Sequence, residues 1–108
     1  MSQSDDLILA GDAVTTDVFD AYLDGAYASY KPRLETVHDK LTTQMWLVRK
    51  YAAKVDAAPA AEVQAAIEAC ETASDALRSA ETGAQRGKAT ALAEDAVAKI
   101  ALVLPARS

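Results

Sequence analysis

The sequence predicts an all-α protein, a bundle of three or four helices built on a long antiparallel helical hairpin with a heptad-spaced seam. Three observations favour this fold class. Apolar residues recur every three or four positions along most of the 108 residues. Each of the three prolines stands at the start or the end of a periodic stretch. Hydrophobic residues make up 51% and charged residues 25%, a composition typical of a folded globular chain.

The first expected helix covers residues 16–30 and follows Thr15, a suitable N-cap. Phe19, Leu23 and Tyr30 form its apolar side, and aspartates occupy another face. No period is evident in residues 1–14, which hold three aspartates and no base. We therefore expect an acidic arm there, either extended or forming one short extra turn, followed by a helical bundle domain over 15–108.

The second expected helix covers residues 32–55 and carries the most regular apolar stripe in the chain. Pro32 suits its first turn, where the missing N–H has no helical partner to lose. Steps of three and four residues are typical of a coiled-coil seam. They run through Leu34, Val37, Leu41, Met45, Val48, Ala52 and Val55.

The remaining two helices are expected at 59–80 and 88–104. The break before Pro59 is short, so we expect the second and third helices to pair as a direct antiparallel hairpin. The glycines at 83 and 87 indicate a linker between the third and fourth helices, and Pro105 ends the last helix.

The charge and the apolar pattern argue against several classes of partner. A net charge of −5 disfavours nucleic acid and anionic lipid, because an acidic protein repels phosphate. No apolar run approaches the length that spans a bilayer, and the N-terminal residues lack the basic start of a secretory signal. We expect a cytoplasmic protein, or one assembled into a particle made in the cytoplasm. The single cysteine, Cys70, falls within an apolar stripe and is expected to be buried.

Charges are also segregated along the chain. Residues 1–30 hold six aspartates and no base, whereas residues 31–54 hold six bases and two acids. Opposite charges attract, so this segregation favours contact between the acidic segment and the basic helix, either within one subunit or between neighbouring subunits. The alternative is that both segments are simply solvated surface.

Catalytic and metal chemistry find little support in the sequence. Glu35 and His38 have the Glu-x-x-His spacing of di-iron bundles, but one histidine per chain could build such a site only in a dimer. No nucleophile stands beside a base in a recognisable arrangement. We expect no enzyme, no cofactor and no metal site in the single chain.

Trp46 is the most informative residue. It projects opposite the Leu34–Val55 stripe, on a helix face where a solvated helix shows polar residues. Either the first helix covers the indole in cis through Phe19, Tyr22 or Tyr27, or Trp46 anchors another chain. The residues expected to bind a partner are Trp46, Arg49, Lys50, Asp39, Tyr22 and Tyr27.

These observations favour a non-enzymatic structural or assembly protein. It would self-associate as a homo-oligomer, or dock as a subunit into a larger complex such as a virion or tail-like particle, through helix packing. One alternative is a small acidic regulatory binder, chaperone-like or antitoxin-like, of a basic client. A second alternative is a dimeric metal-binding protein that uses Glu35 and His38.

Overall fold

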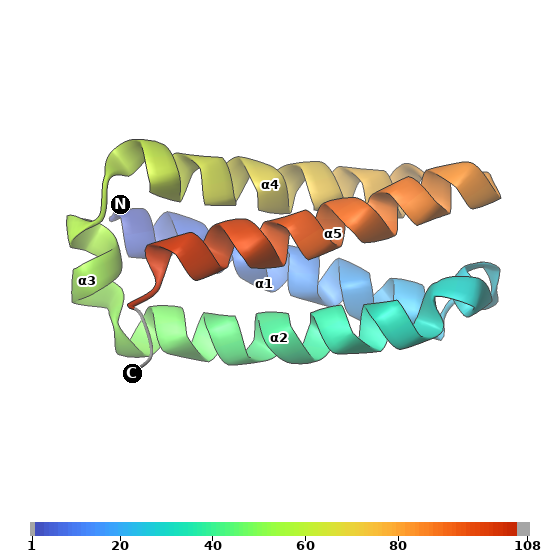
Figure 1. Ribbon diagram of the computed structural model, residues 1–108, viewed down its shortest axis with the longest axis horizontal. Coiled ribbons are helices and arrows are strands. Elements are labelled where there is room, and N and C mark those ends of the chain that lie inside the picture. Colours follow the sequence, from blue (N-terminus) through green and yellow to red (C-terminus); the bar gives the residue numbers. More distant parts are fainter. Residues whose placement is uncertain (1, 106–108) are drawn as a thin grey trace.

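Four long helices run along the same axis in a computed structural model that describes residues 2–105 (Figure 1). Its dimensions are 40 × 24 × 18 Å. The first residue of the expected arm and the last three residues of the expected bundle domain lie outside the described range. The long helices are α1 (Gln3–Leu23), α2 (Lys31–Lys50), α4 (Ala60–Ser79) and α5 (Gly83–Val103). The expectation of an all-α fold is confirmed.

The four long helices form a ring in which each has two neighbours. α1 packs against α2 and α4, and α5 packs against the same two helices from the other side (Figure 1). α2 and α4 therefore lie at opposite corners of the bundle. They run antiparallel, as expected. The expected direct hairpin between residues 32–55 and 59–80 is not formed, because α1 and α5 lie between the two helices.

The N-terminal segment forms a helix from Gln3 onward, so the prediction of an acidic arm at residues 1–14 was wrong. Ser2 caps α1 by accepting a hydrogen bond from the backbone N–H of Asp5. Leu7 and Val14 are fully buried on the side of α1 that faces the other helices. Gly11 is buried between them, and a Cβ there would lie 2.1 Å from the Met45 sulfur. The glycine therefore lets α1 approach α2 closely.

α1 ends at Leu23, seven residues before the expected end of the first helix. Asp24 adopts an extended conformation, and its carboxylate accepts a hydrogen bond from the Ala26 N–H at 2.9 Å. A 3₁₀ helix, η1 (Gly25–Tyr30), then turns the chain into α2. Aspartate commonly bonds to the backbone two residues ahead, and this bond stops the α-helix here.

The expected helix over residues 32–55 is divided at Tyr51 into α2 and a short helix, α3 (Ala52–Ala57). α3 crosses the end of the bundle from the corner of α2 to that of α4 (Figure 1). Gln3 holds α3 in place, because its side-chain amide donates to the carbonyls of Val55, Asp56 and Ala58, each at 3.1 Å.

α5 begins at Gly83, five residues before the expected start at 88. Thr82 and Gln85 form a capping box, in which each side chain accepts from the backbone N–H of the other residue. The expected linker is thus the first turn of a helix. Gly87 lies within α5, and a Cβ there would lie 2.7 Å from the Tyr30 hydroxyl.

The core consists of the inward faces of all four long helices and α3. Of the apolar stripe expected on residues 32–55, every member except the half-buried Ala52 is buried. Cys70 is fully buried, as expected. The apolar stripe of α2 is therefore used inside the bundle.

Candidate interaction surface

Trp46 lies on the outside of the bundle with 58% of its surface exposed. Of the two alternatives for Trp46, the cover in cis is not formed: the indole stays exposed, and Phe19, Tyr22 and Tyr27 make contacts elsewhere. Lys50 lies beside the indole, with its Nζ 4.9 Å from the centroid of the Trp46 ring and 5.4 Å from that of Tyr51. A cation over an aromatic face is attracted to it, but it leaves the indole open to solvent.

The spacing along α2 places Trp46 on the side of that helix nearer to α1. His38, Trp46 and Arg49 lie on one face, because residues separated by three, four or seven to eight positions align along a helix. His38 contacts Phe19 of α1, with 5.3 Å between the ring centroids. Arg49 pairs with Asp12 of α1. The exposed indole therefore belongs to the outer surface that α1 and α2 form together.

Phe19 extends this surface toward the η1 end of the bundle. Its ring stacks with Tyr22 at a centroid distance of 6.4 Å, and Lys31 lies 5.0 Å above the Tyr22 ring. Phe19 is 44% exposed and Leu23, one turn later, is more exposed still. We call the surface made by Phe19, Leu23, His38, Trp46 and Lys50 the Trp46 face.

The six residues expected to bind a partner are divided among several environments. Arg49 and Lys50 lie beside Trp46, with Arg49 already paired to Asp12. Asp39 is exposed, and one of its oxygens lies 3.8 Å from Nδ1 of His38. Tyr22 is half-buried beside Phe19.

Tyr27 is buried, so its expected role in partner binding is corrected. Its hydroxyl donates a hydrogen bond of 2.9 Å to the carbonyl of Leu77, at the end of α4. Burial raises the pKa of Tyr27, against the opposing effect of Arg86. The 3₁₀ turn directs this side chain inward, where it closes one end of the bundle.

Glu35 and His38 line the same shallow hollow as Phe19 and Tyr22. Among the residues that the structure describes, no group of three or more histidine, cysteine or acidic side chains could hold a metal ion. A site in a dimer would need ligands from a second copy.

A longer groove lies between α1 and α4, on another side of the bundle. It consists of two adjoining hollows of about 520 and 380 Å³ that share Asp6, Gln64 and Ile67. Its apolar lining residues are Leu9, Ala10, Ala13 and Ile67, and its charged lining residues are Asp6, Glu71, Asp75 and Arg78. We call this the acidic groove.

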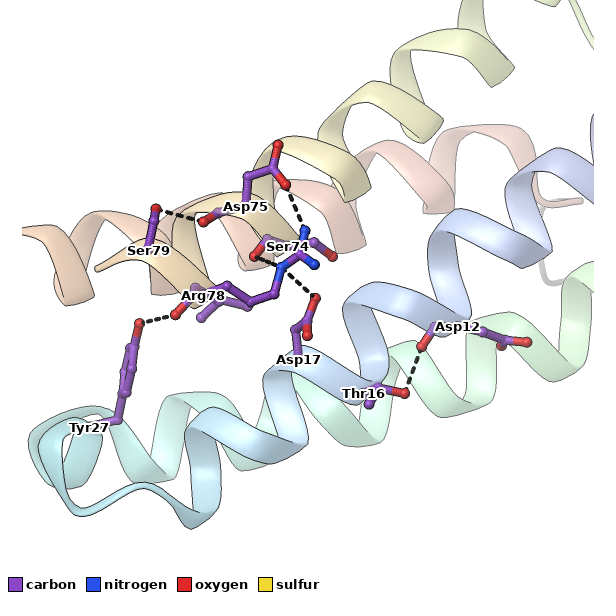
Figure 2. A network of polar contacts seen from close by, with 9 residues as sticks. Asp12, Thr16, Asp17, Tyr27, Ser74, Asp75, Arg78 and Ser79 are labelled. Atoms are coloured by element: carbon purple, nitrogen blue, oxygen red, sulfur yellow. Dashed lines mark hydrogen bonds and ion pairs between the residues drawn. The ribbon is translucent and has the colours of Figure 1, made fainter. Parts of the chain in front are cut away.

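Arg78 closes the acidic groove at one end. Its guanidinium lies between the carboxylates of Asp17 on α1 and Asp75 on α4, at 3.7 and 2.8 Å (Figure 2). Asp6 and Glu71 have no basic partner within residues 2–105. The groove therefore keeps unpaired negative charge along its length.

A third depression of about 610 Å³ lies between α2 and α5. Leu47, Val97 and Leu104 are among its apolar lining residues, and its charged ones are Asp39 and Lys40. Gln44 joins the two helices here by donating from its side-chain amide to the Val97 carbonyl at 2.8 Å. With one acid and one base, this depression has no marked charge.

The acidic groove was not expected from the sequence, because residues 1–14 were assigned to an arm. The sequence did contain a signal for the helix that forms one wall of this groove. The inward residues of α1 step by three and four, like those of α2, but small or polar types occupy several of the positions. The stepping runs through Ser4, Leu7, Gly11, Val14, Val18 and Ala21.

Comparisons with known proteins add no relative. No family model matches the chain, and no curated protein or solved structure gives a significant match. In the part of the chain that the structure describes, no helix has both the length and the apolar character needed to cross a membrane.

Proposed function

We propose that this chain is a non-enzymatic structural or assembly protein that joins copies of itself, or docks into a larger complex, by packing helices against those of other chains. A virion or tail-like component is one concrete form of this role. The observation that carries the proposal is the exposure of Trp46 on an outer helix face, with Phe19 and Leu23 exposed on the same side of the bundle.

Trp46 supports this role because of its size and position. A tryptophan side chain loses much apolar surface to water when it is covered, and tryptophan is enriched among residues that dominate binding energy at interfaces. The apolar stripe of α2 is already buried inside the bundle. Any contact of this helix with another chain therefore falls to the opposite face, where Trp46 and Lys50 lie.

The test is the mass of the protein in solution. Trp46→Ala removes the indole from an exposed position, so we expect the far-UV helical signal and the melting temperature to stay close to those of the wild type. The mass measured by light scattering should fall to that of the monomer, because the assembly loses its anchor.

Leu102→Ala provides the matched control. Leu102 is 71% exposed near the end of α5, away from the Trp46 face, and its truncation also removes exposed apolar surface. The Leu102→Ala protein should keep the wild-type mass. If Trp46→Ala and the wild type have the same mass and the same affinity for any partner complex, the proposal is wrong.

The acidic groove favours a second candidate function, a small acidic regulatory binder of a basic client. Unpaired Asp6 and Glu71 beside apolar Leu9 and Ile67 are suited to a basic amphipathic segment. Such a contact would weaken steeply with salt, whereas a contact anchored by an indole would be more tolerant of salt.

A further inference from the structure

We infer that the acidic groove between α1 and α4 receives the Trp46 face of a second copy of this chain. This inference rests on the proposed assembly function and names the surface that the Trp46 face meets. It joins two different surfaces of the same protein, so each copy offers one Trp46 face and one acidic groove.

The charges near Trp46 are complementary to those of the acidic groove. Lys50 lies beside Trp46, and Lys54 follows on α3; both are exposed and have no carboxylate partner within residues 2–105. The segment from Trp46 to Lys54 contains three bases and no acid. In the groove, Asp6 and Glu71 are the unpaired charges. Opposite charges on two surfaces steer them together and fix their register.

The shapes of the two surfaces also correspond. α2 is a convex ridge with one large side chain, the indole of Trp46, near its end. The groove has small side chains, Ala10 and Ala13, next to Leu9 and Ile67. Small residues leave room for a large side chain from a partner, and leucine and isoleucine supply apolar contact around it.

The groove is also long enough to receive a helix. Its two hollows extend along α4 from Ala60 to Arg78, about 27 Å at the rise of an α-helix. This length accommodates most of α2. The depression between α2 and α5 is a weaker acceptor for a basic ridge, because its Asp39 and Lys40 oppose each other in charge.

A contact between unlike surfaces does not close after two copies. The second copy keeps a free groove, and the first keeps a free Trp46 face, so copies add head to tail into a ring or an open filament. A contact between two Trp46 faces would instead give a closed dimer. This difference makes the inference testable separately from the proposed function.

The experiment mixes two variants, each of which lacks one of the two surfaces. Trp46→Ala removes the anchor and keeps the groove. Ala13→Arg keeps the Trp46 face but fills the groove and adds a positive charge. Each variant alone should be monomeric by light scattering and analytical ultracentrifugation. An equimolar mixture should form a 1:1 dimer and stop there, whereas the wild type grows to larger species.

Ala101→Arg is the matched control for Ala13→Arg. Both alanines are exposed on long helices, and both changes add one positive charge, but Ala101 lines the depression between α2 and α5. The Ala101→Arg protein should assemble like the wild type. Circular dichroism of each variant establishes that it is folded before its mass is interpreted.

A charge exchange gives a second measure that does not depend on filling the groove. Lys50→Glu and Glu71→Lys should each weaken assembly about tenfold, as expected for the loss of one charge pair and its replacement by repulsion. Mixing the two variants should restore assembly, because each meets a complementary surface on the other.

Two outcomes would overturn the inference. In the first, Ala13→Arg assembles like the wild type while Trp46→Ala is monomeric. The Trp46 face then meets another surface, and the groove serves a different occupant, such as a basic client. The proposed function stands in that case. If Trp46→Ala and the wild type have the same mass, the proposed self-association fails, and the inference fails with it.

Discussion

Cys70 is fully enclosed on the inward side of α4. Burial, with a smaller contribution from the charge of Glu71, raises the pKa of its thiol from 9.0 to about 12. A thiolate forms with difficulty in apolar surroundings, because the charged form loses its hydration. The thiol of the folded protein is therefore neutral and unreactive at physiological pH.

This shift predicts a dependence of stability on pH. In the unfolded chain the Cys70 thiol ionises near 9.0, whereas in the folded protein it holds its proton up to about pH 12. The folded state therefore binds more protons, and its stability falls as the pH rises between these values, by at most ~1.4 kcal/mol per pH unit. Cys70→Ala should remove this contribution. Denaturant unfolding of both proteins between about pH 9 and pH 11 measures the difference in slope, and equal slopes would contradict it.

The orientation of individual residues could be predicted only where a helix was predicted correctly. Trp46 lies on the outer face of α2 because the stripe of that helix points inward, and the stripe was evident from the sequence. Tyr27 was predicted to lie on the same helix as Phe19, so the predicted direction of its side chain was wrong. The bond from the Asp24 carboxylate to Ala26 ends α1 before Tyr27 and turns its side chain into the bundle.

At the scale of elements, α2 and α4 were the most predictable. Each begins at or next to a proline, and each inward stripe is largely apolar. The division at Tyr51 was not evident, because Ala52 and Val55 continue the spacing of the stripe across it. α3 bends away there because Gln3, which is distant in sequence, binds the carbonyls of Val55, Asp56 and Ala58.

The stripe of α2 leads to a prediction for Leu41, which is fully buried at the middle of that helix. Leu41→Asp should abolish the cooperative thermal transition, because a carboxylate would enter an apolar interior without a partner. The expected cost of several kcal/mol is comparable with the whole stability of a small domain, about 5–15 kcal/mol. Circular dichroism during heating measures the loss.

Thr43→Asp is the control for this prediction. Thr43 lies on the same helix but is exposed, so its replacement adds the same charge without placing it in the core. The Thr43→Asp protein should melt within a few degrees of the wild type. A Leu41→Asp protein that melted equally well would show that this face of α2 contributes little to the core.

At the scale of the whole molecule, α1 determines the arrangement of the other helices. It fills the corner between α2 and α4, and its first residues hold α3 across the end of the bundle. The expected direct hairpin of α2 and α4 followed from the short break before Pro59, and the first half of α1 was missing from that prediction. Its period was hidden, because Ser4 and Gly11 occupy positions where an apolar residue is normally expected.

Small residues hid α1 for a physical reason. Gly11 gives room to Met45, and Ser4 accepts a close contact with α3, where its N–H donates to Asp56 at 2.8 Å. Small residues at these positions permit close approach between helices and contribute little apolar area. A pattern based on hydrophobicity detects area, so it finds α2 and misses the first half of α1.

Removal of residues 1–14 should therefore abolish cooperative folding, and not merely weaken association as an arm would. Leu7 and Val14 are fully buried, and each such side chain contributes about 1.5–3 kcal/mol by leaving water. The deletion also frees α3 and exposes the apolar faces of α2 and α4. A truncated protein that kept a sharp thermal transition would mean that α1 is not part of the core. Point variants locate the effect: Leu7→Ala should lower the free energy of unfolding by about 2–5 kcal/mol, whereas Leu9→Ala, on the exposed side of the same helix, should leave it nearly unchanged.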